Sequence, residues 1–402
     1  MITIEAFVEQ AHAWLRSVRA PIDAFAWGHG PEEVDVLPCW DDERERAEVE
    51  AAREWLALRH EAGFGGIAFP EKYGGRGLTA AHGFAYQLAE GCYQVPFNEV
   101  WNIGFGMVMP TLLAAGDEEQ KSRFVSRGVR GELLFCQLFS EPGAGSDLGS
   151  LKTRATQQED GSWRVKGRKI WTSMAHVADF GMLLARTAES SAPRNQAFSV
   201  FLVPMDAAGL TVTPIRQITG GSNFNEVLFE NVHVSDDLRI GPVGAGWATA
   251  MTTLGHEHVA LPLAGLGGSV DRLVAMARHL GVHEDPLVRD DLVSLYIRRR
   301  ILDLNAQRTL AALTAGIPAG PEGSIAKLVA TDFLDAMDAV AARLGGMRLV
   351  ADTGEWGMTS YARHMLGTIG LHIGGGTDEV QKNMLAERVL GLPRTPRGRS
   401  AE

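Results

Sequence analysis

The sequence predicts an α+β fold of three domains, in which a strand-rich segment lies between two helical ones. Apolar side chains recur at a spacing of three and four through residues 1–131, alternate in short runs through residues 132–240, and return to helical spacing through residues 241–402. A chain of 402 residues with 45% hydrophobic content is long enough for two or three cores at roughly 100–200 residues each. We therefore expect an N-terminal helical domain, a middle antiparallel β-barrel and a C-terminal four-helix bundle.

The N-terminal domain begins with a helical pattern of apolar residues. Phe7, Ala11 and Leu15 follow helical spacing, and a second periodic segment covers residues 43–62. Six glycines and one proline in residues 63–78 interrupt this periodicity, because these residue types favour turns. The sequence therefore predicts a loop between helices at that place.

The middle domain is indicated by short runs of apolar or alternating residues. Turn residues such as Asp160-Gly161 and Gly220-Gly221-Ser222 separate these runs. The runs are residues 132–140, 162–173, 179–186, 198–204, 210–217 and 225–233. Short strands at this spacing are typical of a small antiparallel barrel or sandwich.

The C-terminal domain starts where helical spacing resumes, at about Gly246, and continues to about Leu390. Its two longest helical patterns cover residues 288–313 and 324–344. Helices of this kind pack with their neighbours as an antiparallel bundle.

Composition and charge exclude several classes of function. The formal net charge of -11 argues against a nucleic-acid partner, because phosphate backbones are bound by an excess of Lys and Arg. A phosphate-bearing cofactor needs only a local basic patch. No apolar run approaches the ~20 residues of a membrane span, and the first residues lack the basic start and apolar core of a signal peptide. We therefore expect a cytoplasmic protein without a membrane span.

The three cysteines, Cys39, Cys92 and Cys136, are far apart in the sequence. They have no paired metal-ligand spacing and too few partners for a disulfide framework. Reduced thiols without a metal are the expectation.

Residues 135–148 read Phe-Cys-Gln-Leu-Phe-Ser-Glu-Pro-Gly-Ala-Gly-Ser-Asp-Leu, an apolar run that ends in a glycine-rich turn. Gly143 and Gly145 allow backbone N–H groups to approach a ligand, and the hydroxyls of Ser140 and Ser146 can donate or accept hydrogen bonds. Such a loop suits a flat heteroaromatic cofactor with a phosphate tail. A plain β-turn without a ligand fits the composition equally well.

Residues 140–147, Ser-Glu-Pro-Gly-Ala-Gly-Ser-Asp, resemble the signature of the acyl-CoA dehydrogenase family, with Ser140 where most members have Thr. Three further segments resemble family motifs in the family's order. They are Phe-Pro-Glu-Lys-Tyr-Gly-Gly at 69–75, Trp-Thr-Ser at 171–173 and Gly-Thr-Asp-Glu-Val-Gln at 376–381. Because these motifs extend over nearly the whole chain, it is identified as a member of this family.

The resemblance implies FAD as the cofactor and an acyl-CoA or acyl-carrier-protein thioester as the substrate. Family members remove the α-proton with a carboxylate and transfer the β-hydride to flavin N5, which leaves a trans-2-enoyl thioester. The electrons then pass to an electron-transfer flavoprotein. By the same resemblance, flavin contacts are expected at Leu138, Phe139, Ser140, Gly145, Ser146, Trp171, Thr172, Ser173, Thr377 and Glu379. Substrate contacts are expected at Ser146, Asn225, His258 and Gly375.

Glu257 is the candidate catalytic base. In a helix over residues 247–261, Ala250, Leu254 and Glu257 share one stripe, which places a carboxylate among apolar residues. Desolvation raises the pKa of a carboxyl toward the range useful to a base at neutral pH. From the residues alone, a rotated helix or a basic partner for Glu257 explains the pattern as well.

The resemblance favours Glu257 as the base. Many family members have the base directly before the Gly-Thr of the C-terminal motif, where this chain has Gly375. A minority, which includes isovaleryl-type, long-chain-type and steroid-side-chain enzymes, has a glutamate on the helix after the β-domain, at the position that aligns with Glu257. The next residue is usually Arg in the family and is His258 here. His256 and His258 point about 200° apart on a helix, so no metal site is expected there.

Gly375 has a second expected role. A carboxylate alone does not remove a thioester α-proton unless donors stabilise the charge that develops on the carbonyl oxygen. In the family these donors are the flavin ribityl 2′-hydroxyl and the backbone N–H at this position. The consecutive glycines at 374–376 are expected to widen the acyl pocket for a bulky, branched or ring-bearing group, or to serve backbone geometry alone.

Two family features of the contact between subunits are missing. The usual Arg-x-x-x-Phe flavin contact from a neighbouring subunit has no counterpart in residues 277–289, and the usual Gln before Gly-Gly is Ala342 here. We expect a homo-oligomer, either dimer or tetramer, or a heterotetramer with unequal sites. The alternatives are a flavin-poor or non-catalytic partner subunit and an oxygen-using acyl-CoA oxidase, but the intact loop 140–146 and Glu257 favour a working dehydrogenase.

Overall fold

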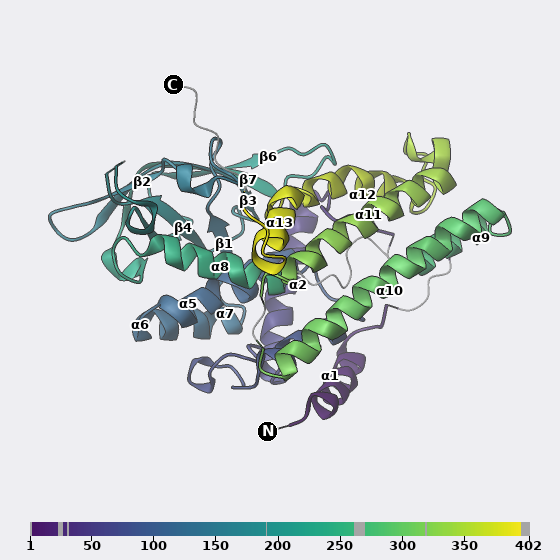
Figure 1. Ribbon diagram of the computed structural model, residues 1–402, viewed down its shortest axis with the longest axis horizontal. Coiled ribbons are helices and arrows are strands. Elements are labelled where there is room, and N and C mark those ends of the chain that lie inside the picture. The colour runs from purple at the N-terminus through teal and green to yellow at the C-terminus, as the bar shows by residue number, and fades with distance from the viewer. Residues whose placement is uncertain are drawn as a thin grey trace.

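The three-domain fold is confirmed. The computed structural model describes residues 2–22, 27–29, 32–189, 191–260, 270–317 and 320–394, without the side chains of residues 257–260. Figure 1 shows helices in the first part of the chain, a sheet in the teal middle part, and long helices in the green and yellow last part.

The N-terminal helices form where the sequence provides caps and an apolar stripe. Thr3 caps α1 by accepting a hydrogen bond from the N–H of Ala6, and Phe7, Ala11 and Leu15 of this helix are fully buried. Residues 63–78 form the expected loop, with one 3₁₀ turn, η1, at Glu71–Tyr73. The other elements are α1 (Ile4–Val18), α2 (Asp42–Glu61), α3 (Ala80–Glu90), α4 (Glu99–Ile103), the π-helical turn η2 (Gly104–Val108), α5 (Met109–Ala115), α6 (Glu118–Gln120), the π-helical turn η3 (Lys121–Val125) and α7 (Ser126–Val129).

The middle domain is an eight-stranded sheet with the order β6-β7-β3-β2-β4-β5-β8, in which β1 pairs with β4. The strands are β1 (Phe135–Leu138), β2 (Arg154–Gln157), β3 (Trp163–Ser173), β4 (Phe180–Arg186), β5 (Phe198–Pro204), β6 (Leu210–Ile215), β7 (Phe224–Val234) and β8 (Arg239–Ile240). All six predicted strands are present, and among the described residues the sequence pattern missed the two short strands β2 and β8.

The sheet differs from the expected antiparallel barrel in two ways. The pairs β1·β4 and β2·β4 are parallel. The antiparallel hairpin of β2 and β3 separates β1 from β4 along the chain, and β4 runs in the same direction as β1 and β2. Among the described residues no pairing joins the edge strands β6 and β8, so the sheet is open.

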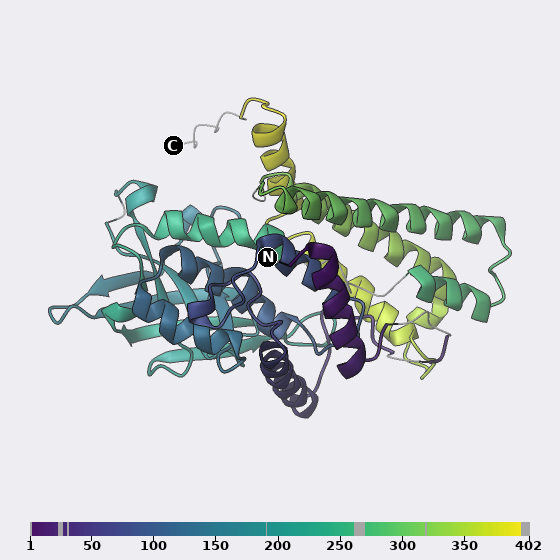
Figure 2. The same ribbon diagram turned by 90° about the horizontal axis from the view of Figure 1, so that it is seen from below.

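The C-terminal helices pack around a separate core that includes Leu273, Met276, Met337 and Tyr361. Figures 1 and 2 show α10 and α11 running side by side, which agrees with their packing contact. The elements are α8 (Gly246–Ala260), α9 (Val270–His279), α10 (Pro286–Thr314), α11 (Gly323–Gly345), the 3₁₀ turn η7 (Gly346–Leu349), α12 (Met358–Leu371), α13 (Asp378–Met384) and the π-helical turn η8 (Leu385–Val389).

Helix α8 connects the sheet to the bundle, because it packs against α5, η2, β5 and also α11. In the part of the chain that the structure describes, no helix has the length and apolar character needed to cross a membrane.

Candidate active site

The loop that follows β1 rests on a buried ion pair. Lys169 Nζ, on β3, donates to the carbonyl oxygen of Phe139 at 2.9 Å and to Glu141 Oε1 at 2.9 Å. The Glu141 carboxylate also accepts the N–H groups of Lys152 at 2.6 Å and Thr153 at 2.9 Å. Burial lowers the pKa of Lys169 to about 8, against the opposing charge of Glu141. Burial tends to raise the pKa of Glu141, but Lys169 and these hydrogen bonds outweigh it and lower the pKa.

The outer face of this loop is open. Gly145 and Ser146 are exposed and Ser140 is partly exposed. A Cβ atom added at Gly143 or Gly145 would meet nothing within 4 Å. The backbone of the loop is therefore accessible to a large ligand. Leu138 and Phe139, by contrast, have buried side chains, so they would contact a ligand through their backbone atoms.

Trp171 lies beside this loop, turned out by an irregularity in β3. The register between β3 and β7 shifts between Lys169 and Thr172, and Trp171 adopts a left-handed backbone with φ of 60°. Its side chain is 57% exposed. The N–H of Ile170 donates to the carbonyl oxygen of Ser140 at 3.0 Å, so the two predicted flavin segments are neighbours. An exposed aromatic face next to open backbone suits a flat ring system.

Thr172 and Asn225 lie beneath Trp171, in the interior. Asn225 Nδ2 donates to the carbonyl oxygen of Thr172 at 3.1 Å and lies 3.0 Å from His176 Nδ1. His176 Nε2 in turn lies 2.9 Å from Glu45 Oε1 on α2. Thr172 Oγ1 and Asn225 Oδ1 are buried without a hydrogen-bond partner among the described residues. This placement gives Asn225 a role in holding the strand, and its contact with the substrate stays a prediction.

Glu99 is a candidate site residue that the sequence pattern did not reveal. It begins α4, which packs against β1, and its carboxyl is hydrogen-bonded to Ser173 at the end of β3. Burial raises the pKa of Glu99, opposed by this hydrogen bond. The sequence feature that could have identified it is an acidic residue within the mostly apolar residues 95–103.

The glycine turn between α12 and α13 has a strained shape that glycine tolerates. Gly375 and Gly376 have φ of 67° and 84°. Gln381 Nε2 donates to the carbonyl oxygen of Gly375 at 2.7 Å, and Thr377 Oγ1 caps α13 by accepting the N–H of Val380 at 3.2 Å. None of the described residues accepts a hydrogen bond from the N–H of Gly375. Within the described part of the chain, that donor is therefore available to a ligand.

Glu257 and His258 lie in the last turn of α8, but their side chains are outside the described part of the structure. Their predicted roles in proton removal and substrate binding therefore stay predictions. The exposed Glu379, in the first turn of α13, also stays a predicted flavin contact.

Three family models match consecutive parts of the chain. The N-terminal, middle and C-terminal domains of acyl-CoA dehydrogenases match residues 32–132, 136–232 and 244–390. The fold and the open loop beside Trp171 thus define an FAD-dependent oxidoreductase. The chain belongs to the acyl-CoA dehydrogenase family, as its motifs predicted.

Known relatives agree with this assignment. The chain is 35% identical to "Acyl-CoA dehydrogenase IpdE1" of Mycobacterium tuberculosis over 99% of this chain and 100% of that protein. Among solved structures, "Tcur3481-Tcur3483 steroid ACAD" has a TM-score of 0.76 and 26% identity, with 98% of both chains covered. The "ChsE4-ChsE5 complex from Mycobacterium tuberculosis" has a TM-score of 0.75 and 25% identity, with 98% of this chain and 99% of that chain covered.

The residues present fit FAD. The open backbone at Gly143 and Gly145 leaves room for a phosphate-bearing chain, and the exposed ring of Trp171 offers a surface for a flat heterocycle. The buried ion pair below the loop makes this surface rigid before the cofactor binds.

Proposed function

We propose that the protein dehydrogenates the α,β-bond of an acyl-CoA thioester, with Glu257 as the base for the α-proton. The observation that carries this proposal is the free N–H of Gly375, which is held in a fixed turn where the family places a donor for the thioester carbonyl. Gly375 has no side chain to act as a base, so the proton requires another acceptor. Glu257 is available on α8, the helix that connects the sheet to the bundle.

In this mechanism the chain performs three tasks. The N–H of Gly375 donates to the thioester carbonyl oxygen and stabilises the negative charge that develops there, which makes the α-proton more acidic. Glu257 accepts that proton. Trp171 and the loop 140–146 orient the ring system and limit the access of water. FAD, when bound, supplies the acceptor for the β-hydride, which leaves the trans-2-enoyl thioester.

We infer that the acyl group is bulky or contains rings. The glycines at 374–376 have no side chains that would occupy the predicted acyl pocket, and a related structure is named a steroid acyl-CoA dehydrogenase. Coenzyme A, rather than an acyl carrier protein, is the proposed thiol because the related enzymes are named acyl-CoA dehydrogenases.

The proposed electron acceptor is an electron-transfer flavoprotein, in a cytoplasmic setting. The proposed assembly is an oligomer, because α10 exposes many apolar side chains that water would otherwise contact. These side chains are Leu287, Val293, Tyr296, Ile297, Ile301 and Leu304. A heterotetramer is the favoured form, since two related structures are named as two-component proteins. Mass measurement of the native protein, alone and co-expressed with candidate partners, tests this assembly.

The reaction is tested by anaerobic bleaching of flavin absorbance with short, branched, long and steroid-like acyl-CoAs. We expect fast bleaching by the ring-bearing class, and loss of about 100-fold or more in the rate with Glu257→Gln while FAD is retained. Glu99→Gln is the matched control, because it also replaces a carboxyl by an amide near the predicted site. If Glu257→Gln bleaches as fast as wild type, Glu257 is not the base. If no acyl-CoA bleaches the FAD-loaded protein, the proposed reaction is wrong.

A further inference from the structure

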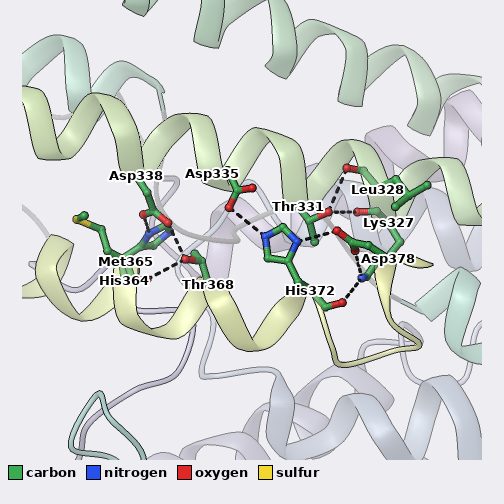
Figure 3. A network of polar contacts seen from close by, with 10 residues as sticks. All are labelled: Lys327, Leu328, Thr331, Asp335, Asp338, His364, Met365, Thr368, His372 and Asp378. Atoms are coloured by element: carbon green, nitrogen blue, oxygen red, sulfur yellow. Dashed lines mark hydrogen bonds and ion pairs between the residues drawn. The ribbon is translucent and has the colours of Figure 1, made fainter. Parts of the chain in front are cut away.

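A buried lysine of α11 joins the two ends of the glycine turn (Figure 3). Lys327 Nζ donates to the carbonyl oxygen of His372, where the turn begins, at 3.1 Å, and to the carboxylate of Asp378, where α13 begins. The N–H of Asp378 donates to the same carbonyl oxygen of His372 at 3.1 Å. Only 5% of the Lys327 side chain is exposed. The turn is therefore closed by a charged group inside the protein.

Hydrogen bonds of Asp378 and His372 extend the contacts of Lys327 into a network that joins α11, the end of α12 and the start of α13. His372 Nδ1 lies 2.7 Å from Asp378 Oδ2, and His372 Nε2 lies 3.0 Å from Asp335 Oδ1 on α11. Figure 3 shows the ring of His372 between these two carboxylates. The carboxylate of Asp378 thus has a partner for each of its oxygens. A buried charge with such partners is costly to displace, so the network resists movement of the turn.

The turn has little means of holding its own shape. Its central residues are glycines, which lose more backbone freedom on ordering than any other residue. The carbonyl of Gly375 is oriented by Gln381, but Gln381 lies on α13, whose first residue is Asp378. The orientation of the Gly375 peptide therefore depends on where Lys327 holds Asp378.

We propose that Lys327 is a positioning residue for the reaction. By binding the His372 carbonyl and the Asp378 carboxylate together, it fixes the turn so that the N–H of Gly375 is directed at the thioester carbonyl oxygen. This inference rests on the proposed dehydrogenation. Donors to a developing oxyanion act only within a narrow geometry, and a displacement of about 1 Å lowers rates by about 100-fold.

The test compares Lys327→Met with a matched control on the same helix. Methionine keeps a similar length and removes the charge. The control, Arg343→Met, removes a cation that pairs with Asp291 on α10 at a more exposed position. Two quantities are measured, namely hydrogen exchange of residues 372–378 in the protein without FAD, and the rate constant of flavin reduction by acyl-CoA in the loaded enzyme.

In Lys327→Met, the backbone amides of residues 372–378 should exchange hydrogen about tenfold faster than in wild type, or more, because the turn opens more often. Its reduction rate constant should fall by about 10-fold to 100-fold, while the Kd for acyl-CoA changes less than about threefold. Arg343→Met should match wild type in both. Lys327→Arg keeps the charge and should recover part of the rate.

The proposal is overturned if exchange in 372–378 stays at the wild-type level, or if both methionine variants loosen the whole bundle equally. If Lys327→Met does not fold, Asp378→Asn removes the charged partner and the same two outcomes apply. If wild-type flavin is not reduced by any acyl-CoA, the proposed reaction fails, and the exchange data still decide whether Lys327 anchors the turn.

Discussion

Two turns of the molecule are anchored in the same manner, one in the sheet and one in the helical bundle. Lys169 joins the carbonyl of Phe139 to the carboxylate of Glu141, and Lys327 joins the carbonyl of His372 to the carboxylate of Asp378. A lysine ammonium has three donors and can serve both acceptors at once. The predicted flavin loop and the predicted thioester turn are thus each built over one buried cation.

The two anchors differ in their surroundings. Lys169 is fully buried and its partner carboxylate also accepts two backbone N–H groups. Asp378 is more exposed than Glu141 and is paired with His372 as well as with Lys327, and its hydrogen bond raises the pKa of His372. The anchor of the glycine turn therefore contains a titratable ring, whereas the corresponding carboxylate of the loop after β1 is held by two backbone donors as well as by its lysine.

The largest effect is expected for Lys169→Met. This change leaves the carboxylate of Glu141 buried without a cation, and breaking a buried pair in this way costs about 3–5 kcal/mol of unfolding free energy. Urea unfolding and the FAD content of the purified variant measure this. Adding Glu141→Gln should restore part of the loss. A loss of less than about 1 kcal/mol in unfolding free energy would contradict the role of Lys169 in holding the loop.

Asp378→Asn should cost less, about 1–3 kcal/mol, because the amide keeps the shape and the site is more exposed. The same urea measurement applies. A greater loss than that of Lys169→Met would reverse the order of the two anchors.

His372→Gln should reveal the dependence on pH. The hydrogen bond with Asp378 raises the pKa of His372 above its ordinary 6.5, followed by the contribution of Asp335. A raised folded-state pKa means that the stabilisation is fully present below pH 6.5 and is lost as the pH rises through the folded-state value. The free-energy difference between wild type and variant should therefore shrink as the pH rises from 6.5 through the folded-state pKa of His372. A difference that grows over this range would show that the charged ring does not support the turn.

Glu99→Gln should have the smallest effect, and at neutral pH it should stabilise the protein rather than destabilise it. The reason is that burial raises the pKa of Glu99, although its interaction with Ser173 opposes this. Its charged form is disfavoured in the folded state, so wild type should lose stability relative to the variant as the pH rises from 4.5 through the folded-state pKa of Glu99. Thermal unfolding across this range measures it. A variant that loses stability at neutral pH would mean that the charged carboxylate has a strong partner.

Local patterns were sufficient to predict the long elements. The apolar spacing gave both long bundle helices, which the structure places at Pro286–Thr314 and Gly323–Gly345. The four-residue strand β2 and the two-residue strand β8 were missed because they are too short to show a periodic pattern of apolar residues. Parallel pairing with β4 depends on the path of the chain, which alternation does not encode.

The motifs in the sequence predicted the chemistry of the site, but they did not predict the buried lysines that hold its two turns. Lys169 lies two residues before Trp171, but its hydrogen bond to Glu141 joins residues 28 positions apart. Lys327 did leave a signal, since a lysine on the helix face shared with Thr331 and Leu334 is unusual, and all three are buried. In this chain, the lysine on that buried face is the one that binds both ends of the glycine turn.

The most direct test of the account is deuterium exchange at the α-carbon of 3,3-dimethylbutanoyl-CoA, which has no β-hydrogen to transfer. The account predicts that the FAD-loaded wild type exchanges the α-protons with deuterated water, and that Glu257→Gln slows this exchange by about 100-fold to 10,000-fold while FAD is retained. Exchange by Glu257→Gln at the wild-type rate would contradict the assignment of Glu257 as the base. Loss of exchange in Glu99→Gln instead would move that role to Glu99.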